Sequence, residues 1–132
     1  MLKKIHHVGI VVCSIAAAYA FYRDTLSLSV HKEDIIQDQG VKAALLTIGS
    51  SAIELLEPIT PGTGVARFLD SRGEGLHHVC FETDDVHREL ETARARGLAV
   101  IDQQPRPGLA GLICFLHPRS SHGVLIEYAQ PQ

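Results

Sequence analysis

The chain has 132 residues, which is enough for one domain with its own core. Hydrophobic residues make up 45% of it, yet tryptophan is absent and aromatic residues reach only 5%, so aliphatic side chains must fill that core. The net charge of −3 excludes a broad electrostatic attraction to nucleic acid or to an anionic membrane surface.

The first half of the chain predicts the element order β-α-β-β-β. A β-branched run predicts a strand over 5–12, and Ser14 offers an N-cap for a helix over 15–25. Turn sequences around Gly40 and Gly49 then separate three more strands. These strands are predicted over 28–36, 41–48 and 52–56. A linker rich in proline and glycine follows, with a short helix over 65–71 that Gly73 ends.

The second half predicts the same order again. A strand over 76–83 precedes a helix over 86–96, which Asp84 or Asp85 caps and Gly97 ends. A Pro/Gly loop at 105–111 and a turn at 118–123 separate the remaining strands. These are predicted over 100–101, 112–116 and 124–128.

Neither half has enough strands to be stable alone, so we expect one α+β domain over residues 1–132. Module 1 covers about 1–58, a linker with a short helix covers 59–73, and module 2 covers about 74–132. The two βαβββ modules are expected to form a curved, barrel-like sheet around a central cleft, which is where a ligand would bind.

A pair of histidines occurs in both halves. The run IHHVGI at 5–10 returns as LHHVCF at 76–81, so His7 and His78 are 71 positions apart (78 − 7). Each half also places one acid in an apolar strand, and these acids, Glu54 and Glu127, are 73 positions apart (127 − 54). A duplicated fold would bring both pairs to one pseudo-twofold axis, where two nitrogens and two carboxylates suit a divalent metal.

Only one histidine of each pair can face the cleft, because side chains alternate along a strand. The ligands are therefore either His7 and His78 or His6 and His77, and the spacing does not choose between them. A single strand histidine is more often a hydrogen-bonded core or surface residue. The repetition favours a shared metal site, since two buried carboxylates without partners would each cost several kcal/mol.

The three cysteines, Cys13, Cys80 and Cys114, contain no Cys-x-x-Cys pair and lie in apolar runs, so we expect buried thiols in a reducing compartment. The first predicted strand leaves no room for a signal peptide, and no apolar run reaches about 18 residues. We therefore expect a cytoplasmic protein that does not enter a membrane.

Six strings of the sequence resemble one known family. Three of them, GEGLHH at 73–78, FLHP at 115–118 and GVLIE at 123–127, are typical of the epimerase branch rather than of the fold as a whole. Together the strings span nearly the whole chain. The chain is therefore similar to the methylmalonyl-CoA epimerases of the vicinal oxygen chelate (glyoxalase/bleomycin resistance/dioxygenase) superfamily. The strings lie at 6–12, 21–24, 53–58, 73–78, 115–118 and 123–127.

The resemblance implies that His7, Glu54, His78 and Glu127 bind a divalent metal, with cobalt favoured and manganese, nickel, iron or zinc as alternatives. It implies that (2R)- and (2S)-methylmalonyl-CoA are interconverted through an enolate chelated to that metal. Epimerisation needs two proton-transferring groups. Glu127 is the first candidate and Glu54 the second. The resemblance also implies that the protein is a homodimer. It implies that its small-molecule partner, the substrate, is an acyl-CoA.

The sequence departs from this family in two places. Certain epimerases carry a further glutamate shortly after a Gln-Gly-Val element, where this chain has Ala43, so the second acid/base stays open. The loop at 105–113 is also one residue short and lacks a basic residue before the next strand.

Two other functions are compatible with the same fold. A glyoxalase I-type isomerase, acting on a glutathione hemithioacetal, would use the same four ligands. A metal-free small-molecule-binding protein of the drug-resistance type would not need them, and the presence of all four ligand-type residues argues against it.

Overall fold

The computed structural model describes all 132 residues and shows two compact units. One unit joins residues 1–7 to 78–132, and the other consists of residues 8–77. Strands β1 (Leu2–Val11) and β5 (Gly75–Thr83) each contribute residues to both units. No helix in either unit is long and apolar enough to cross a membrane.

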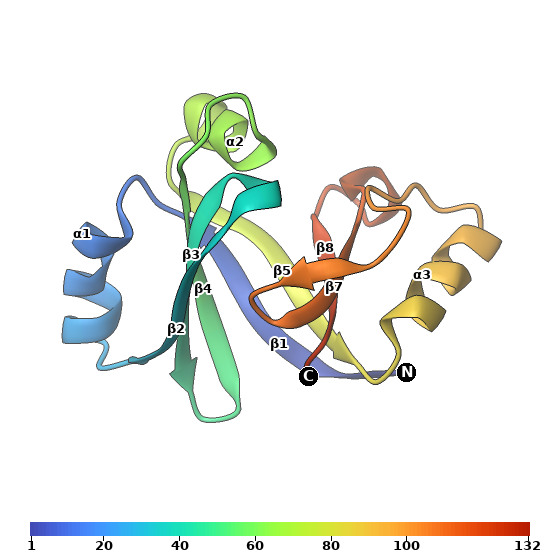
Figure 1. Ribbon diagram of the computed structural model, residues 1–132, viewed down its shortest axis with the longest axis horizontal. Coiled ribbons are helices and arrows are strands. Elements are labelled where there is room, and N and C mark those ends of the chain that lie inside the picture. The colour runs from blue at the N-terminus through green and yellow to red at the C-terminus, as the bar shows by residue number, and fades with distance from the viewer. The chain divides into compact units, whose positions relative to one another are not determined.

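In the unit of residues 8–77, the strand order is β2-β3-β4-β1. β2 (Ser29–Ile36), β3 (Val41–Ile48) and β4 (Ser51–Pro58) pair antiparallel, and a 3-10 turn at Gln37–Gln39 joins the first two. Helix α1 (Ile15–Tyr19) packs against β3 and β4 (Figure 1), and helix α2 (Gly64–Arg72) contacts β4. The apolar core under α1 consists of Val12, Ile15, Tyr19, Leu28, Ala44, Leu46 and Leu55.

In the unit that joins residues 1–7 to 78–132, the strand order is β1-β5-β8-β7-β6. β5 pairs parallel with β8 (Ile126–Gln130), while β7 (Gly111–Leu116) pairs antiparallel with both β8 and β6 (Arg106–Gly108). Helix α3 (Val86–Ala95) lies beside β7 and β8 (Figure 1), and a 3-10 turn at Pro118–Ser120 precedes β8. The core residues under α3 are Val86, Leu90 and Cys114.

The helices of the two modules begin in the same way. Ser14 Oγ accepts a hydrogen bond from the backbone N–H of Ala17 at 3.1 Å, and Asp85 Oδ1 accepts one from Arg88 at 3.0 Å. Both are N-caps, which satisfy backbone donors that the first turn of a helix leaves without partners.

A second acceptor at each helix start comes from the last strand of the same module. Glu57 Oε1 accepts the N–H of Ile15 at 2.8 Å, and Gln130 Oε1 accepts the N–H of Val86 at 3.0 Å. Both acceptors follow a predicted metal ligand by three positions, so they too are 73 positions apart (130 − 57). The sequence repeat is therefore also a repeat of structure, in which each helix start is tied to the strand that carries a predicted ligand.

The predicted order of two βαβββ modules is confirmed, with differences at the element ends. The largest difference is at the end of the first helix, because α1 ends at Tyr19 and a π-helical turn follows over Ala20–Thr25. The N–H of Leu26 donates to the carbonyl oxygen of Phe21, five residues earlier, which is the wider hydrogen-bond spacing of a π turn.

The predicted strand at 100–101 is wrong, because only an isolated bridge joins Val100 to Leu116. The side chain of Asp102 accepts the backbone N–H of Phe115 at 2.8 Å and so ends the ladder. The sixth strand forms instead inside the predicted loop, as β6. Pro107 is tolerated there because β6 is the last strand of the sheet, and an edge strand needs no donor on its outer side.

The expectation of three buried thiols holds for Cys80 and Cys114 but is wrong for Cys13, which is exposed. Cys13 follows the end of β1 and precedes the N-cap of α1, so it lies in a surface connection rather than in a strand. Burial raises the pKa of the Cys114 thiol to about 12, which keeps that thiol protonated and unreactive at neutral pH.

We expect Glu57→Ala and Gln130→Ala each to lower the free energy of unfolding by about 1 kcal/mol, because each removes a hydrogen bond at a helix start. Urea denaturation followed by circular dichroism measures this. Gln104→Ala, at an exposed position, is the control and is expected to change little. Equal stability of all three variants and the wild type would show that these bonds do not hold the helices.

One thiol per chain is expected to react with Ellman's reagent in the native protein, because Cys13 alone is exposed, and all three are expected to react in denaturant. Cys13→Ser should abolish the native reaction. Reaction of two or three thiols before unfolding would contradict the burial of Cys80 and Cys114.

Candidate metal centre

Three of the predicted site residues lie together in the unit that joins residues 1–7 to 78–132. His7 is on β1, His78 on β5 and Glu127 on β8, three strands that are neighbours in the sheet. The Nε2 atoms of His7 and His78 are 3.1 Å apart, and Glu127 Oε1 is 3.0 Å from each of them. All three side chains are buried.

The spacing of these three donor atoms fits a divalent metal. They form an almost equilateral triangle with sides of 3.0–3.1 Å. Ligands at right angles around a metal, with bonds of about 2.1 Å, are separated by about 3.0 Å. Glu127 Oε1 is buried and receives no well-aligned hydrogen bond, so its lone pairs are available to a cation. The triangle therefore matches one face of an octahedral site built from imidazole and carboxylate.

The charge of Glu127 also favours a cation here. Burial by itself raises the pKa of the Glu127 carboxyl, but the two neighbouring imidazoles, His7 and His78, lower it, and the net result lies below the usual range. The carboxyl is therefore an anion at neutral pH. A buried anion whose neighbours are two imidazole nitrogens is a good partner for a divalent ion.

His7 has a further polar neighbour on its other side. Its Nδ1 atom lies 2.8 Å from Nδ1 of His6, with the two rings almost perpendicular at 82°. His6 is half-buried, and burial, followed by the proximity of His7, lowers its pKa. The residue pattern kept His6, with His77, as an alternative ligand pair to His7 and His78, and it did not predict a contact between His6 and His7.

His78 packs against the ring of Phe115, which the sequence analysis did not identify as a site residue. The ring of Phe115 meets that of His78 edge to face, with centroids 5.7 Å apart and an interplanar angle of 88°. Arg106 lies over Phe115 at 5.8 Å from its centroid and pairs with Asp102 at 2.9 Å. The only signal for Phe115 was its place in one of the family-like strings.

The fourth predicted ligand, Glu54, belongs to the unit of residues 8–77, where it is a buried residue of β4. Its cross-strand partner on β3 is Leu45. Ala43 lies two positions from Leu45 on the same face and is almost fully buried, so β3 presents no acid next to Glu54.

His77 also belongs to the unit of residues 8–77. Its ring meets that of Phe68, on α2, with centroids 5.0 Å apart. His6 and His77 are equivalent in the sequence repeat, yet the ring of His6 contacts a histidine and the ring of His77 contacts a phenylalanine. The repeat therefore does not extend to the surroundings of the first histidine of each pair.

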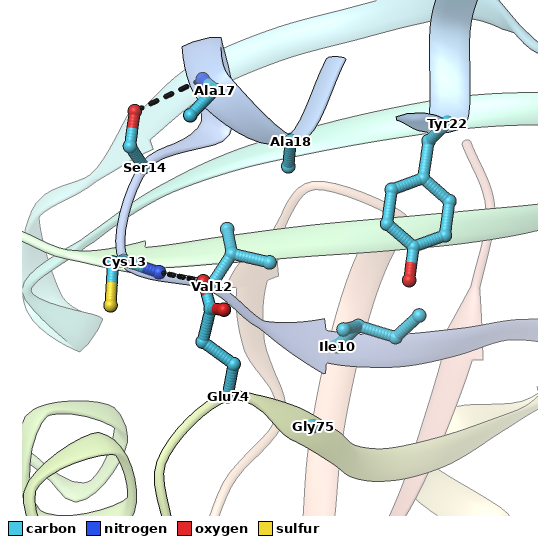
Figure 2. Close-up of a pocket in the computed structure, with 9 residues that line it drawn as sticks. All are labelled: Ile10, Val12, Cys13, Ser14, Ala17, Ala18, Tyr22, Glu74 and Gly75. Atoms are coloured by element: carbon cyan, nitrogen blue, oxygen red, sulfur yellow. Dashed lines mark hydrogen bonds between the residues drawn. The ribbon is translucent and has the colours of Figure 1, made fainter. Parts of the chain in front are cut away.

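The unit of residues 8–77 also contains a cavity of about 390 Å³ between β1, α1 and the start of β5 (Figure 2). It contains none of the predicted ligands. Its one acid, Glu74, accepts the backbone N–H of Cys13 at 2.8 Å through Oε2. The glutamate of the GEGLHH string therefore has a structural role, in which it fastens the end of β1 to the start of β5.

Comparison with known proteins places this geometry in a family. The chain is 34% identical to the ethylmalonyl-CoA/methylmalonyl-CoA epimerase of Cereibacter sphaeroides, over 98% of this chain and 99% of that protein. A methylmalonyl-CoA epimerase solved with methylmalonyl-CoA and NH4+ superposes with a TM-score of 0.95 at 37% identity, over 99% of this chain and 96% of the other.

A variant of the Streptomyces coelicolor methylmalonyl-CoA epimerase, solved with 2-nitronate-propionyl-CoA, also gives a TM-score of 0.95 at 37% identity, over 99% of both chains. The family model of the Glyoxalase/Bleomycin resistance protein/Dioxygenase superfamily matches residues 6–115. The predicted fold class is thereby confirmed, and the chain belongs to the Glyoxalase/Bleomycin resistance protein/Dioxygenase superfamily.

Proposed function

We propose that this protein is a metal-dependent epimerase that interconverts (2R)- and (2S)-methylmalonyl-CoA. The observation that carries the proposal is the buried triangle of His7, His78 and Glu127, in a chain that matches methylmalonyl-CoA epimerases almost from end to end. The acyl-CoA substrate is supported by the ligands of two of those structures, which are methylmalonyl-CoA and 2-nitronate-propionyl-CoA.

His7, His78 and Glu127 hold the metal in this proposal, and Glu54 is the fourth ligand. Two observations support Glu54: it is the repeat equivalent of Glu127, and its carboxylate is buried. A divalent ion bound there would polarise both carbonyl oxygens of a malonyl-type thioester and acidify the hydrogen between them. Cobalt is our favoured ion, with manganese, nickel, iron and zinc as alternatives that accept the same nitrogen and oxygen donors.

Epimerisation needs one group that removes the proton from one face of the substrate carbon and another that returns a proton to the opposite face. Glu127 and Glu54 take these two roles in our proposal. Glu127 Oε1 faces the two imidazoles, so its second oxygen, Oε2, is the atom that exchanges the proton. Ala43 brings no carboxylate to the face of β3 beside Glu54, so Glu54 itself supplies the second group.

Two rival functions are less well supported. A glyoxalase I-type isomerase would use the same donors, but the relatives compared above are epimerases of acyl-CoA. A metal-free binding protein would have no use for a buried carboxylate between two imidazoles. The proposal treats residues 1–132 as one domain of a cytoplasmic protein, and it takes the homodimer from the family resemblance.

We expect His7→Ala and His78→Ala to lower cobalt affinity and epimerase activity together by at least 100-fold. Loss of a residue that only hydrogen-bonds to a metal ligand costs about 10–100-fold in affinity, and these variants remove a ligand itself. Equilibrium dialysis followed by metal analysis measures the affinity. His77→Ala is the matched control from the same string and is expected to bind cobalt like the wild type. Unchanged metal content in both variants would show that His7 and His78 are not metal ligands.

The epimerase reaction is tested by deuterium incorporation at the α-carbon of methylmalonyl-CoA in D₂O, followed by mass spectrometry. Exchange with isomer interconversion is expected in the cobalt-loaded protein and is expected to stop on chelation. Glu54→Gln should keep the metal, since its amide oxygen remains a donor, and slow the exchange by about 100-fold or more. Metal binding without any exchange would redirect the search to glutathione hemithioacetals.

A further inference from the structure

His6 is a polar side chain that contacts the candidate metal centre and that the proposed function does not use. We propose that His6 is a positioning residue that selects the metal-binding tautomer of His7. The proposal rests on the metal centre described above. Its basis is the 2.8 Å separation between the Nδ1 atoms of His6 and His7, at a half-buried place where the two rings meet at 82°.

A neutral imidazole carries one proton, on either Nδ1 or Nε2, and binds a metal through the nitrogen that lacks it. His7 directs Nε2 at His78 and Glu127, so a metal between these three residues requires the proton of His7 on Nδ1. The acceptor for that proton is Nδ1 of His6, which then carries its own proton on Nε2.

His78 competes for the same proton. Its Nε2 atom is 3.1 Å from His7 Nε2 and would accept a proton placed there, which would remove the lone pair that a metal needs. His6 Nδ1 and His78 Nε2 are therefore rival acceptors on opposite sides of one ring. The hydrogen bond to His6 shifts the balance toward the tautomer that leaves Nε2 open to the metal.

The equivalent histidine of the repeat provides a built-in control. The ring of His77 lies against Phe68 rather than against another imidazole. Loss of His77 therefore removes a histidine of the same motif without removing a hydrogen bond to His7.

The test compares four variants by their dissociation constants for Co²⁺, measured by competition with a chromophoric chelator. His6→Ala removes the acceptor and is expected to weaken binding by about 10–100-fold. His6→Asn places an amide oxygen where Nδ1 was and should restore binding to within a few-fold of the wild type. His6→Asp offers a carboxylate acceptor and should bind at least as tightly as the wild type. His77→Ala should match the wild type.

A second readout separates tautomer selection from packing. Long-range proton–nitrogen NMR spectra of the metal-free protein should show the proton of His7 on Nδ1 in the wild type and in His6→Asn, and on Nε2 in His6→Ala. Melting curves of the metal-free variants establish that each is folded.

Three results would overturn the proposal. Wild-type affinity in His6→Ala would show that the acceptor is not needed. Equal weakening in all the His6 variants would show that the ring matters only for packing. A wild-type protein that binds no Co²⁺ would overturn the metal centre as well, so the failure of the proposed function is distinguishable from the failure of this inference alone.

Discussion

The structure depends on a buried carboxylate held between two imidazoles. Glu127 Oε1 lies 3.0 Å from both His7 Nε2 and His78 Nε2, and none of the three side chains reaches solvent to any extent. Removing a carboxylate from water is costly unless an opposite charge compensates it. The Nε2 atoms of the two imidazoles and Oε1 of the carboxylate converge on one point, where a divalent cation can bind all three groups at once.

The repeat explains how a small, aliphatic chain positions such a group. Each module ties the start of its helix to the strand that carries a predicted ligand, through Glu57 in one case and Gln130 in the other. The hydrogen bond reaches the first N–H of the helix and so ties the helix start to the strand. The two halves nevertheless differ around the first histidine of each pair, because His6 contacts His7 whereas His77 contacts Phe68. The repeat therefore accounts for the candidate donor residues, whereas the neighbours of the histidines differ between the two halves.

The element order and the candidate donors were predictable, since hydrophobic periodicity, turn residues and internal repetition all appear in the sequence. The choice between His6 and His7 came only from the family resemblance, because adjacent strand residues are equivalent until a sheet face is known. The place of β6 was missed because the Asp102 side chain takes the N–H of Phe115, a long-range contact without a local signature. The contact of His6 with His7 was missed because strand alternation predicts that the two rings lie apart.

The most direct test of the account is an anomalous difference map at the cobalt absorption edge, from crystals of the cobalt-loaded protein. We predict one strong peak within about 2.0–2.2 Å of His7 Nε2, His78 Nε2 and a Glu127 oxygen. A peak at another group of side chains, or no peak in protein that carries stoichiometric cobalt, would contradict the claim that His7, His78 and Glu127 build one metal centre.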